Sequence, residues 1–324
     1  MRVRSGRGQF RTVFTLALLA ASVALAGRGS ASPRDERLEG SSGALRVVVA
    51  APGESVAYSG VPWDVRTVFE YRWVAEPDPR AKRTAFVPYE QGFRVPARAG
   101  AWRLQLRRGR DIAQTDLVVL ATVPASRVRK GYLNRYHIGH YPVDRSMAAE
   151  YLPPSAFIEV TEANQDVFVS DHFQLRQFLT KDQRQVWPKY VVLDLRLIDK
   201  LELLLRELNA SGAAANALHV MSGYRTPQYN GPGGKGRARL SRHMYGDAAD
   251  VWIDRDGDGR MDDLNGDGKC DLADAQVLVS AVERVEQAHP ELTGGAAAYE
   301  ATGAHGPFVH VDARGRIARW ALRD

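Results

Sequence analysis

The sequence predicts an α+β protein in which a small Ig-like β-sandwich domain precedes an α+β domain. Between residues 44 and 122, short stretches alternate apolar with polar residues and are separated by Gly and Pro, which is typical of half-buried strands. Further along, residues 193–208 and 272–288 have the apolar spacing of amphipathic helices. Short apolar stretches lie among them, at 218–221, 248–253 and 308–311, and we expect these to be strands of the second domain.

Composition indicates an ordinary globular protein. The chain has 324 residues, of which 44% are hydrophobic and 25% charged, so it is long enough for two domains. The net charge of +6 comes largely from arginines before residue 130, and it favours anionic partners such as wall polymers or lipid head groups. No arginine-rich run alternates with aromatic residues, so a nucleic-acid partner is not expected. We expect a monomer.

The first 26 residues have the pattern of a signal peptide. Four arginines precede an apolar run over 13–26 that ends in Ala24-Leu25-Ala26. This run is short for a membrane span, so we expect cleavage and no stable span afterwards; an uncleaved anchor is the alternative. The protein is then exported and either periplasmic or secreted. Residues 27–43 are small, charged and Gly-rich, and are expected to form a flexible linker.

The predicted β-sandwich covers residues 44–122. Its expected strands lie at 45–50, 65–74, 92–96, 101–107 and 117–120. Arginines on alternate positions form a solvated face, with wall binding as the alternative. A linker is expected to begin within 121–126, and residues 123–165 are interpreted as an irregular arm.

The second domain is predicted over residues 166–324. A helix is expected over 170–179 from the spacing of its apolar residues, and a longer amphipathic helix over 193–208. The strand at 218–221 should deliver the polar residues that follow it to the edge of a sheet, where loops carry function.

Two stretches of this domain carry a set of metal ligands. Residues 222–250 contain His243 and Asp250, and residues 308–314 contain His310. Two histidines and one carboxylate are a typical ligand set of catalytic zinc, which keeps its fourth position for water. Bound zinc lowers the pKa of that water and polarises a carbonyl. The alternative is a structural zinc site or none.

The same stretches resemble a known family. Ser-Gly-Tyr-Arg-Thr-Pro at 222–227, Ser-x-His-x-x-Gly-x-Ala-x-Asp at 241–250 and Phe-Val-His-Val-Asp at 308–312 are similar to the zinc D-alanyl-D-alanine carboxypeptidase-like peptidases (LAS-type metallopeptidases). The resemblance covers roughly the second half of the chain. It implies a central antiparallel sheet bearing the metal. It also implies hydrolysis of peptidoglycan stem peptides or crosslinks that contain D-alanine, as a D,D-carboxypeptidase or endopeptidase. End trimming versus crosslink cleavage, and a D,D versus an L,D bond, stay open.

The resemblance also implies roles for other residues. Arg225 matches an arginine that faces the substrate in the family, where a guanidinium can hold a terminal carboxylate or stabilise the oxyanion of the tetrahedral intermediate; a structural arginine paired with a nearby acid is the alternative. Tyr224 beside it is predicted to contact substrate too. The family's general base lies two or three residues before the last histidine, where this chain has Phe308 and Pro307. Asp312 lies two residues from His310, on the same face of the predicted strand, and we favour it as the base. His305 is the other choice, and an orienting role is the alternative for Asp312.

Two acidic loops over 254–274 follow the predicted Asp250 strand. Each begins with the D-x-[DN]-x-D-G pattern of a calcium loop, and they resemble dockerin or EF-hand loops. The predicted calcium ligands and loop positions are Asp254, Asp256, Asp258, Arg260, Asp262, Asp263, Asn265, Asp267, Lys269, Asp271 and Asp274. Cys270, the single cysteine, falls at an apolar loop position and is expected to be buried. A solvated acidic loop without an ion is the alternative.

We therefore predict an exported zinc peptidase with structural calcium that acts on peptidoglycan in cell-wall remodelling. Two other classes of protein stay open. One is a catalytically inactive wall-binding or scaffold protein, which the missing base at the family positions would favour. The other is a calcium-dependent adhesion module that binds through the β-sandwich.

Overall fold

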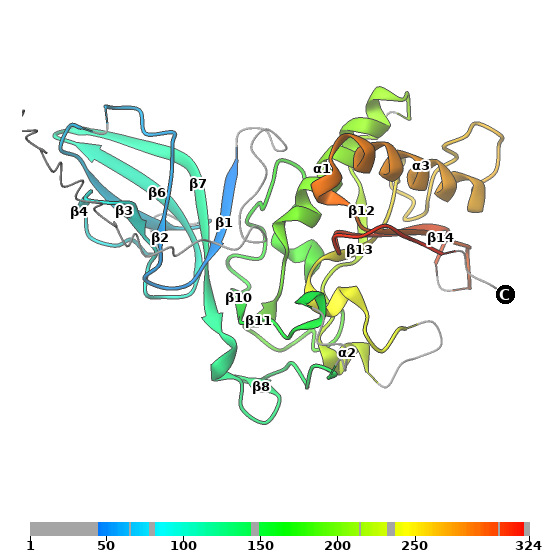
Figure 1. Ribbon diagram of the computed structural model, residues 1–324, viewed down its shortest axis with the longest axis horizontal. Coiled ribbons are helices and arrows are strands. Elements are labelled where there is room, and N and C mark those ends of the chain that lie inside the picture. Colours follow the sequence, from blue (N-terminus) through cyan, green and yellow to red (C-terminus); the bar gives the residue numbers. More distant parts are fainter. Residues whose placement is uncertain are drawn as a thin grey trace, which may run out of the picture. The chain divides into compact units, whose positions relative to one another are not determined.

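The computed structural model describes residues 45–64, 66–77, 82–143, 149–213, 215–231, 237–303 and 305–320 (Figure 1). The predicted signal peptide (1–26) and linker (27–43) lie outside the described residues. Within these ranges, no helix has the length and apolar character needed to span a membrane.

The larger sheet combines N-terminal strands with strands from later in the chain. In the described part of the chain it has seven strands: β1 (Arg46–Ala50), β3 (Glu70–Ala75), β4 (Val87–Pro88), β6 (Gly100–Arg108), β7 (Asp111–Pro124), β10 (Ala156–Val160) and β11 (Lys189–Val191). Their order is β11-β10-β7-β6-β3-β4, and β1 pairs in parallel with β7. The other neighbours are antiparallel.

The N-terminal part of this sheet has one apolar core. Trp73, Leu104 and Leu106 are buried on one face, and Phe93 and Val56 pack against them. The last two belong to a short ribbon formed by β2 (Ser55–Val56) and β5 (Phe93–Arg94). The structure is thus an open sheet with a two-stranded cover, whereas the sequence predicted a β-sandwich. Period-two alternation identifies half-buried strands, but it does not show whether a second full sheet covers them.

Strand β7 continues where the sequence predicted a linker. Its last residues, Thr122–Pro124, pair with Ala156–Ile158 of β10. Residues from both parts of the chain share one core cluster, in which Val47 and Leu120 lie with Phe157. The predicted boundary at residues 122–123 therefore falls inside a paired strand.

The second sheet carries the stretches that resemble zinc peptidases. Among the described residues its order is β12 (His219–Ser222), β13 (Ala248–Trp252), β15 (Phe308–Asp312), β14 (Gly295–Tyr299) and β16 (Ala318–Arg319). β12, β13, β15 and β14 are antiparallel to their neighbours, and β16 pairs in parallel with β14. This agrees with the central antiparallel sheet that the resemblance implied.

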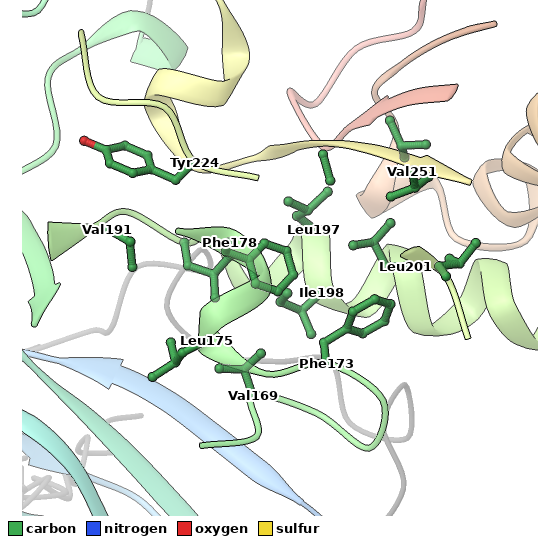
Figure 2. Close-up of a cluster of buried hydrophobic side chains, with 14 of the residues drawn as sticks. Val169, Phe173, Leu175, Phe178, Val191, Leu197, Ile198, Leu201, Tyr224 and Val251 are labelled. Atoms are coloured by element: carbon green, nitrogen blue, oxygen red, sulfur yellow. The ribbon is translucent and has the colours of Figure 1, made fainter. Parts of the chain in front are cut away.

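Two helices cover one face of this sheet. α1 (Leu195–Ala210) and α3 (Leu272–Ala288) were both predicted from apolar spacing, and they pack on each other and on the sheet (Figure 1). Figure 2 shows Ile198 and Leu201 of α1 in one apolar cluster with Phe178 and with Val251 of β13. The apolar side chains of the sheet thus point toward the helices, which leaves the opposite face for polar side chains.

The remaining elements are short. They are the 3-10 helices η1 (Ala125–Arg127), η2 (Ala149–Tyr151), η3 (Leu175–Phe178), η4 (Arg242–Tyr245) and η5 (Pro290–Leu292), the helix α2 (Pro227–Asn230), and the hairpin of β8 (Tyr132–Leu133) and β9 (Tyr136–His137). The helix predicted over 170–179 is only the single turn η3. Its apolar residues are buried as expected, but the chain before Leu175 is not helical.

Candidate active site

Strand register brings two of the predicted ligands together. Asp250 of β13 lies directly opposite His310 of β15. Their neighbours Val251 and Val309 are fully buried in the core cluster that includes the helices. Because side chains alternate along a strand, Asp250 and His310 share the face away from the helices.

His243 reaches the same face from the turn η4. Gly246 ends this turn with φ +76°, and a Cβ there would lie 2.4 Å from the carbonyl oxygen of Val192. Only glycine combines this backbone conformation with so close an approach. The tight turn lets the chain enter β13 directly, so that His243 and Asp250 converge although they lie seven positions apart in the sequence.

The three side chains converge on one point. His243 Nε2 and His310 Nδ1 each lie 3.1 Å from Asp250 Oδ1, and they are 3.2 Å from each other. All three residues are buried. Among the described residues, they form one of two groups of His, Cys, Asp and Glu side chains close enough to hold a metal ion.

The opposite nitrogen of each histidine has its own partner. His243 Nδ1 lies 2.7 Å from the carbonyl oxygen of Gly223, and His310 Nε2 lies 3.0 Å from Asp312 Oδ2. A carbonyl can only accept, so His243 carries its proton on Nδ1 and turns the lone pair of Nε2 toward Asp250. A carboxylate on His310 Nε2 likewise directs Nδ1 to the shared point. This donor set fits zinc.

Burial and neighbouring charges shift the pKa of each of the three clustered side chains. Burial works against the charged form of Asp250, but His243, His310 and Arg225 outweigh it and hold its pKa well below the usual range. Burial lowers the pKa of His243. Burial also opposes a charge on His310, yet its hydrogen bonds to Asp250 and Asp312 raise its pKa to about 9. Zinc binding therefore has to displace a proton from His310.

Asp312 supports His310 and lies away from the shared point. Its side chain is fully buried, and it accepts hydrogen bonds from the backbone N–H groups of Gly295 and Arg314. The Arg314 guanidinium also pairs with both of its oxygens. The strand face was predicted correctly, but the carboxylate contacts the nitrogen of His310 that faces away from Asp250. This geometry favours the orienting role over the role of general base.

Arg225 contacts the ligand Asp250. Its guanidinium donates to Asp250 Oδ2 and, through Nε at 2.8 Å, to Ser222 Oγ. Both oxygens of Asp250 are therefore engaged, one at the ligand cluster and one with Arg225. The arginine lines the same cavity as the ligands, as the resemblance implied.

Tyr224 lies elsewhere. Its ring belongs to the buried apolar cluster shown in Figure 2. Its hydroxyl hydrogen-bonds to the hydroxyl of Tyr141 at 2.9 Å. The cavity lining does not include it. The predicted contact between Tyr224 and substrate thus has no support in the structure, because the residue after Gly223 turns back into the core.

A cavity of about 830 Å³ opens over the three ligands. One wall is aromatic: Tyr299 stacks on Phe308 with ring centroids 4.7 Å apart, and Trp320 lies 5.3 Å from the His310 ring. His305, predicted as a proton carrier, lines this cavity and contacts Phe308 edge-on. The volume of the cavity is in the range of binding sites for small molecules.

Glu300, Tyr299 and Trp320 also line the cavity, and none of them was predicted. Tyr299 and Glu300 lie at the end of β14, whose sequence Gly-Ala-Ala-Ala-Tyr is poor in the β-branched residues that signal a strand. Their one sequence signal is an aromatic and an acidic residue shortly before the Phe308 stretch.

The two acidic loops have nearly the same structure. Asp254 accepts hydrogen bonds from the N–H groups of Gly257, Asp258 and Gly259, and Asp263 accepts the equivalent bonds from Gly266, Asp267 and Gly268. Asp254, Asp256 and Asp262 form the second group close enough to hold a metal ion. Asp274, by contrast, is buried, and its carboxylate accepts a hydrogen bond from the backbone N–H of Asp271, the N-cap residue of α3.

Side chains around the two acidic loops differ from expectation in one respect. Cys270, which was expected to be buried, is exposed. The start of α3 turns its apolar face inward through Ala275 and Leu278, so position 270 remains on the loop surface.

Comparison with known families supports the peptidase interpretation. Residues 142–258 match the sequence model of Peptidase_M15_2, which is described as peptidoglycan L,D-endopeptidase MepK. The matched segment includes Arg225, His243 and Asp250, and it ends inside the first acidic loop. His310 lies beyond it and joins the site through the β13–β15 pairing. Residues 142–258 are thus similar to an M15-type peptidase, and two of the three residues of the His–Asp–His group lie within this segment. Searches of curated proteins and of solved structures found no match.

Proposed function

We propose that this protein is a zinc-dependent endopeptidase that cleaves an L,D bond in peptidoglycan stem peptides or crosslinks during cell-wall remodelling. The buried His243, Asp250 and His310 group, open to a cavity of about 830 Å³, carries the proposal. The choice of an L,D bond as the bond that is cleaved rests on the family description, which names an L,D-endopeptidase. The sequence resemblance favoured a D-alanine-containing bond of the D,D type but left the choice between a D,D and an L,D bond open, and the family description favours the L,D bond.

The side chains of the site have separate roles in holding the metal and in orienting its ligands. Zinc held by His243, Asp250 and His310 would supply a Lewis acid that polarises the scissile carbonyl and lowers the pKa of water. Asp312 and the Gly223 carbonyl keep the two imidazole rings in the ligating orientation. Arg225 fixes the second oxygen of Asp250.

We assign proton transfer to His305. Its Nδ1 lies 2.8 Å from the carbonyl oxygen of Gly306, so Nδ1 carries the hydrogen and Nε2 keeps a lone pair that can accept a proton. His305 takes a proton from the attacking water and passes it to the leaving amine, so that the C–N bond breaks to give a carboxyl and an amine. His305→Gln should lower kcat with unchanged zinc content. Glu300→Gln is the comparison variant. A larger fall in kcat for Glu300→Gln than for His305→Gln would assign proton transfer to Glu300.

The test of the function is release of muropeptides from purified peptidoglycan, with zinc and calcium supplied. Wild type is compared with His310→Ala and with His289→Ala, a control at a partly exposed histidine after α3. Two defined crosslinked substrates, one with an L,D bond and one with a D,D bond, identify the specificity by product mass. We expect cleavage of the L,D substrate by wild type and the control only. A folded, zinc-loaded wild type that cleaves neither substrate would support the wall-binding or scaffold role instead.

Calcium binding by the two loops stays a prediction. The repeated capture of three backbone N–H groups by Asp254 and by Asp263 supports it, because this folds both loops alike around their leading carboxylates. We expect calorimetry on the full chain to detect calcium, and Asp263→Asn to weaken one site. Heat signals that are unchanged by this substitution would count against the second loop.

We also propose that the protein is exported to the periplasm or secreted, on the basis of the basic and apolar pattern over residues 1–26. Mass spectrometry of the mature N-terminus from fractionated cells tests this. An intact N-terminus in the membrane fraction would favour the uncleaved anchor.

A further inference from the structure

Tyr299 shares the face of the sheet that carries the metal ligands. Tyr299 of β14 lies opposite Phe308 of β15, and Ala297 lies opposite His310. Directly opposed residues of an antiparallel pair project to the same face, and so do residues two apart on one strand. The Tyr299 ring therefore projects to the side of His310 and Asp250, and it lines their cavity.

The Tyr299 ring is held by two contacts. It stacks on Phe308 at an interplanar angle of 6°, and Trp320 Nε1 lies 3.0 Å from its hydroxyl oxygen. Indole N–H is a donor only, so the tyrosine oxygen accepts this bond and its own hydrogen stays available. Among the described residues, the structure gives that hydrogen no acceptor.

The hydroxyl keeps its proton at neutral pH. Burial, together with the negative charge of Asp250, raises the pKa of Tyr299. The site thus holds a neutral, oriented O–H donor on the wall of the cavity.

The cationic side chains nearby are already engaged. Arg225 pairs with Asp250 and bonds to Ser222, while Arg314 pairs with Asp312. Removing either guanidinium from its partner would leave a buried carboxylate without its counter-charge, which is costly. Tyr299 adds to these side chains a neutral hydrogen-bond donor that can turn toward a new negative oxygen without disturbing either ion pair.

We propose that Tyr299 is a further catalytic residue, whose hydroxyl donates a hydrogen bond to the carbonyl oxygen of the scissile peptide as that oxygen gains negative charge. This inference rests on the proposed peptidase function. When water adds to the carbonyl carbon, the C=O π electrons move onto the oxygen, and Tyr299 stabilises that oxyanion while keeping its own proton. When the C–N bond breaks, the electrons return to restore the carbonyl and the hydrogen bond weakens. Trp320 is a positioning residue that fixes the hydroxyl.

The experiment measures kcat and KM of the zinc-loaded full chain on the L,D-crosslinked substrate. Tyr299→Phe keeps the stacking ring and removes only the hydroxyl. We expect kcat to fall by about 10²- to 10³-fold, as for loss of one oxyanion donor, with KM and zinc content unchanged. Tyr132→Phe, at an exposed tyrosine of β8, is the matched control and should equal wild type.

Two further readouts separate catalysis from structure. A phosphinate analogue of the tetrahedral species should bind Tyr299→Phe more weakly by a similar factor, while the cleaved product binds equally to both proteins. Trp320→Phe should lower kcat less than Tyr299→Phe, and the double variant should be no slower than Tyr299→Phe.

The outcomes distinguish the two proposals. A wild type that cleaves no substrate overturns the peptidase function and this inference with it. An active wild type and a Tyr299→Phe variant of equal kcat overturn the inference alone. A variant that loses zinc, or in which only KM rises, also overturns it, because Tyr299 would then hold the fold or the substrate.

Discussion

At the scale of single residues, Asp312 decides how His310 is held: it contacts Nε2 of the ring, while Nδ1 faces Asp250. The spacing of His243 and Asp250, and the Phe-Val-His-Val-Asp stretch around His310, predicted a metal site that the structure brings together within 3.2 Å. Sequence could place Asp312 on the same strand face as His310. It could not show which ring nitrogen the carboxylate would contact, because that depends on the rotamer and on Arg314.

The two roles of Asp312 predict different results for Asp312→Asn. If the carboxylate orients His310, we expect zinc affinity to fall by about 10- to 100-fold, since outer partners of zinc-bound histidines have effects of this size. Competition with a chromophoric chelator measures this. Asp194→Asn, at a buried aspartate that pairs with Arg196 at the start of α1, is the control. Full zinc affinity together with lost activity would restore the general-base role.

At the scale of elements, the sequence predicted α1, α3 and the strands that bear the ligands, but not β14. A helix with a continuous apolar stripe can be recognised from the spacing of its apolar residues. A strand rich in alanine, such as β14, lacks the β-branched residues that indicate a strand. The aromatic wall of the cavity depends on β14, so sequence could not reveal it. A longer helix was predicted where the structure has only the single turn η3. In a short segment, an irregular buried chain can show the same spacing of apolar residues as a helix.

The two helices and the ligand strand share a buried ion pair. Lys200 of α1 is fully buried, and its Nζ lies 2.5 Å from Glu286 of α3 and 2.7 Å from the backbone carbonyl oxygen of Asp312. Glu286 also accepts from the backbone N–H of Gly294 and pairs with Arg319 of β16. This network ties both helices to the end of β15.

Lys200→Met should therefore destabilise the protein strongly. Removing one partner of a buried pair typically costs about 3–5 kcal/mol, because the other charge stays buried. Urea unfolding of the full chain measures the loss. Glu207→Gln breaks an exposed pair with Arg284 between the same two helices and should cost about 0–1 kcal/mol. Equal costs for the two variants would show that the buried pair has no special role.

At the scale of the whole molecule, the class was predicted better than its division into parts. An α+β architecture follows from the observed elements, as expected. A separate β-sandwich was also expected, but β10 and β11 extend the N-terminal sheet, and β7 runs through the predicted domain boundary. Local patterns identify strands, but the pairing of strands far apart in sequence depends on the packing of the complete chain.

A chain that begins at residue 125 should be unstable for this reason. It would lack the β7 partner of β10, and it would lack Val47 and Leu120, which pack in the core cluster of Phe157. Each fully buried aliphatic side chain contributes about 1.5–3 kcal/mol. We expect this fragment to melt at a markedly lower temperature than the full chain or to aggregate through the exposed edge of β10. Unchanged melting would show that the second domain folds on its own.

The pairing of Asp250 with His310 also orders events during synthesis. The two side chains lie sixty positions apart in the sequence, and both acidic loops fall between them. The ribosome must therefore complete β15 before a nascent chain can hold metal through all three ligands. Chains released before β15 would carry Arg225, His243 and Asp250 but an incomplete ligand set, so full metal affinity is expected only once the whole chain has been made.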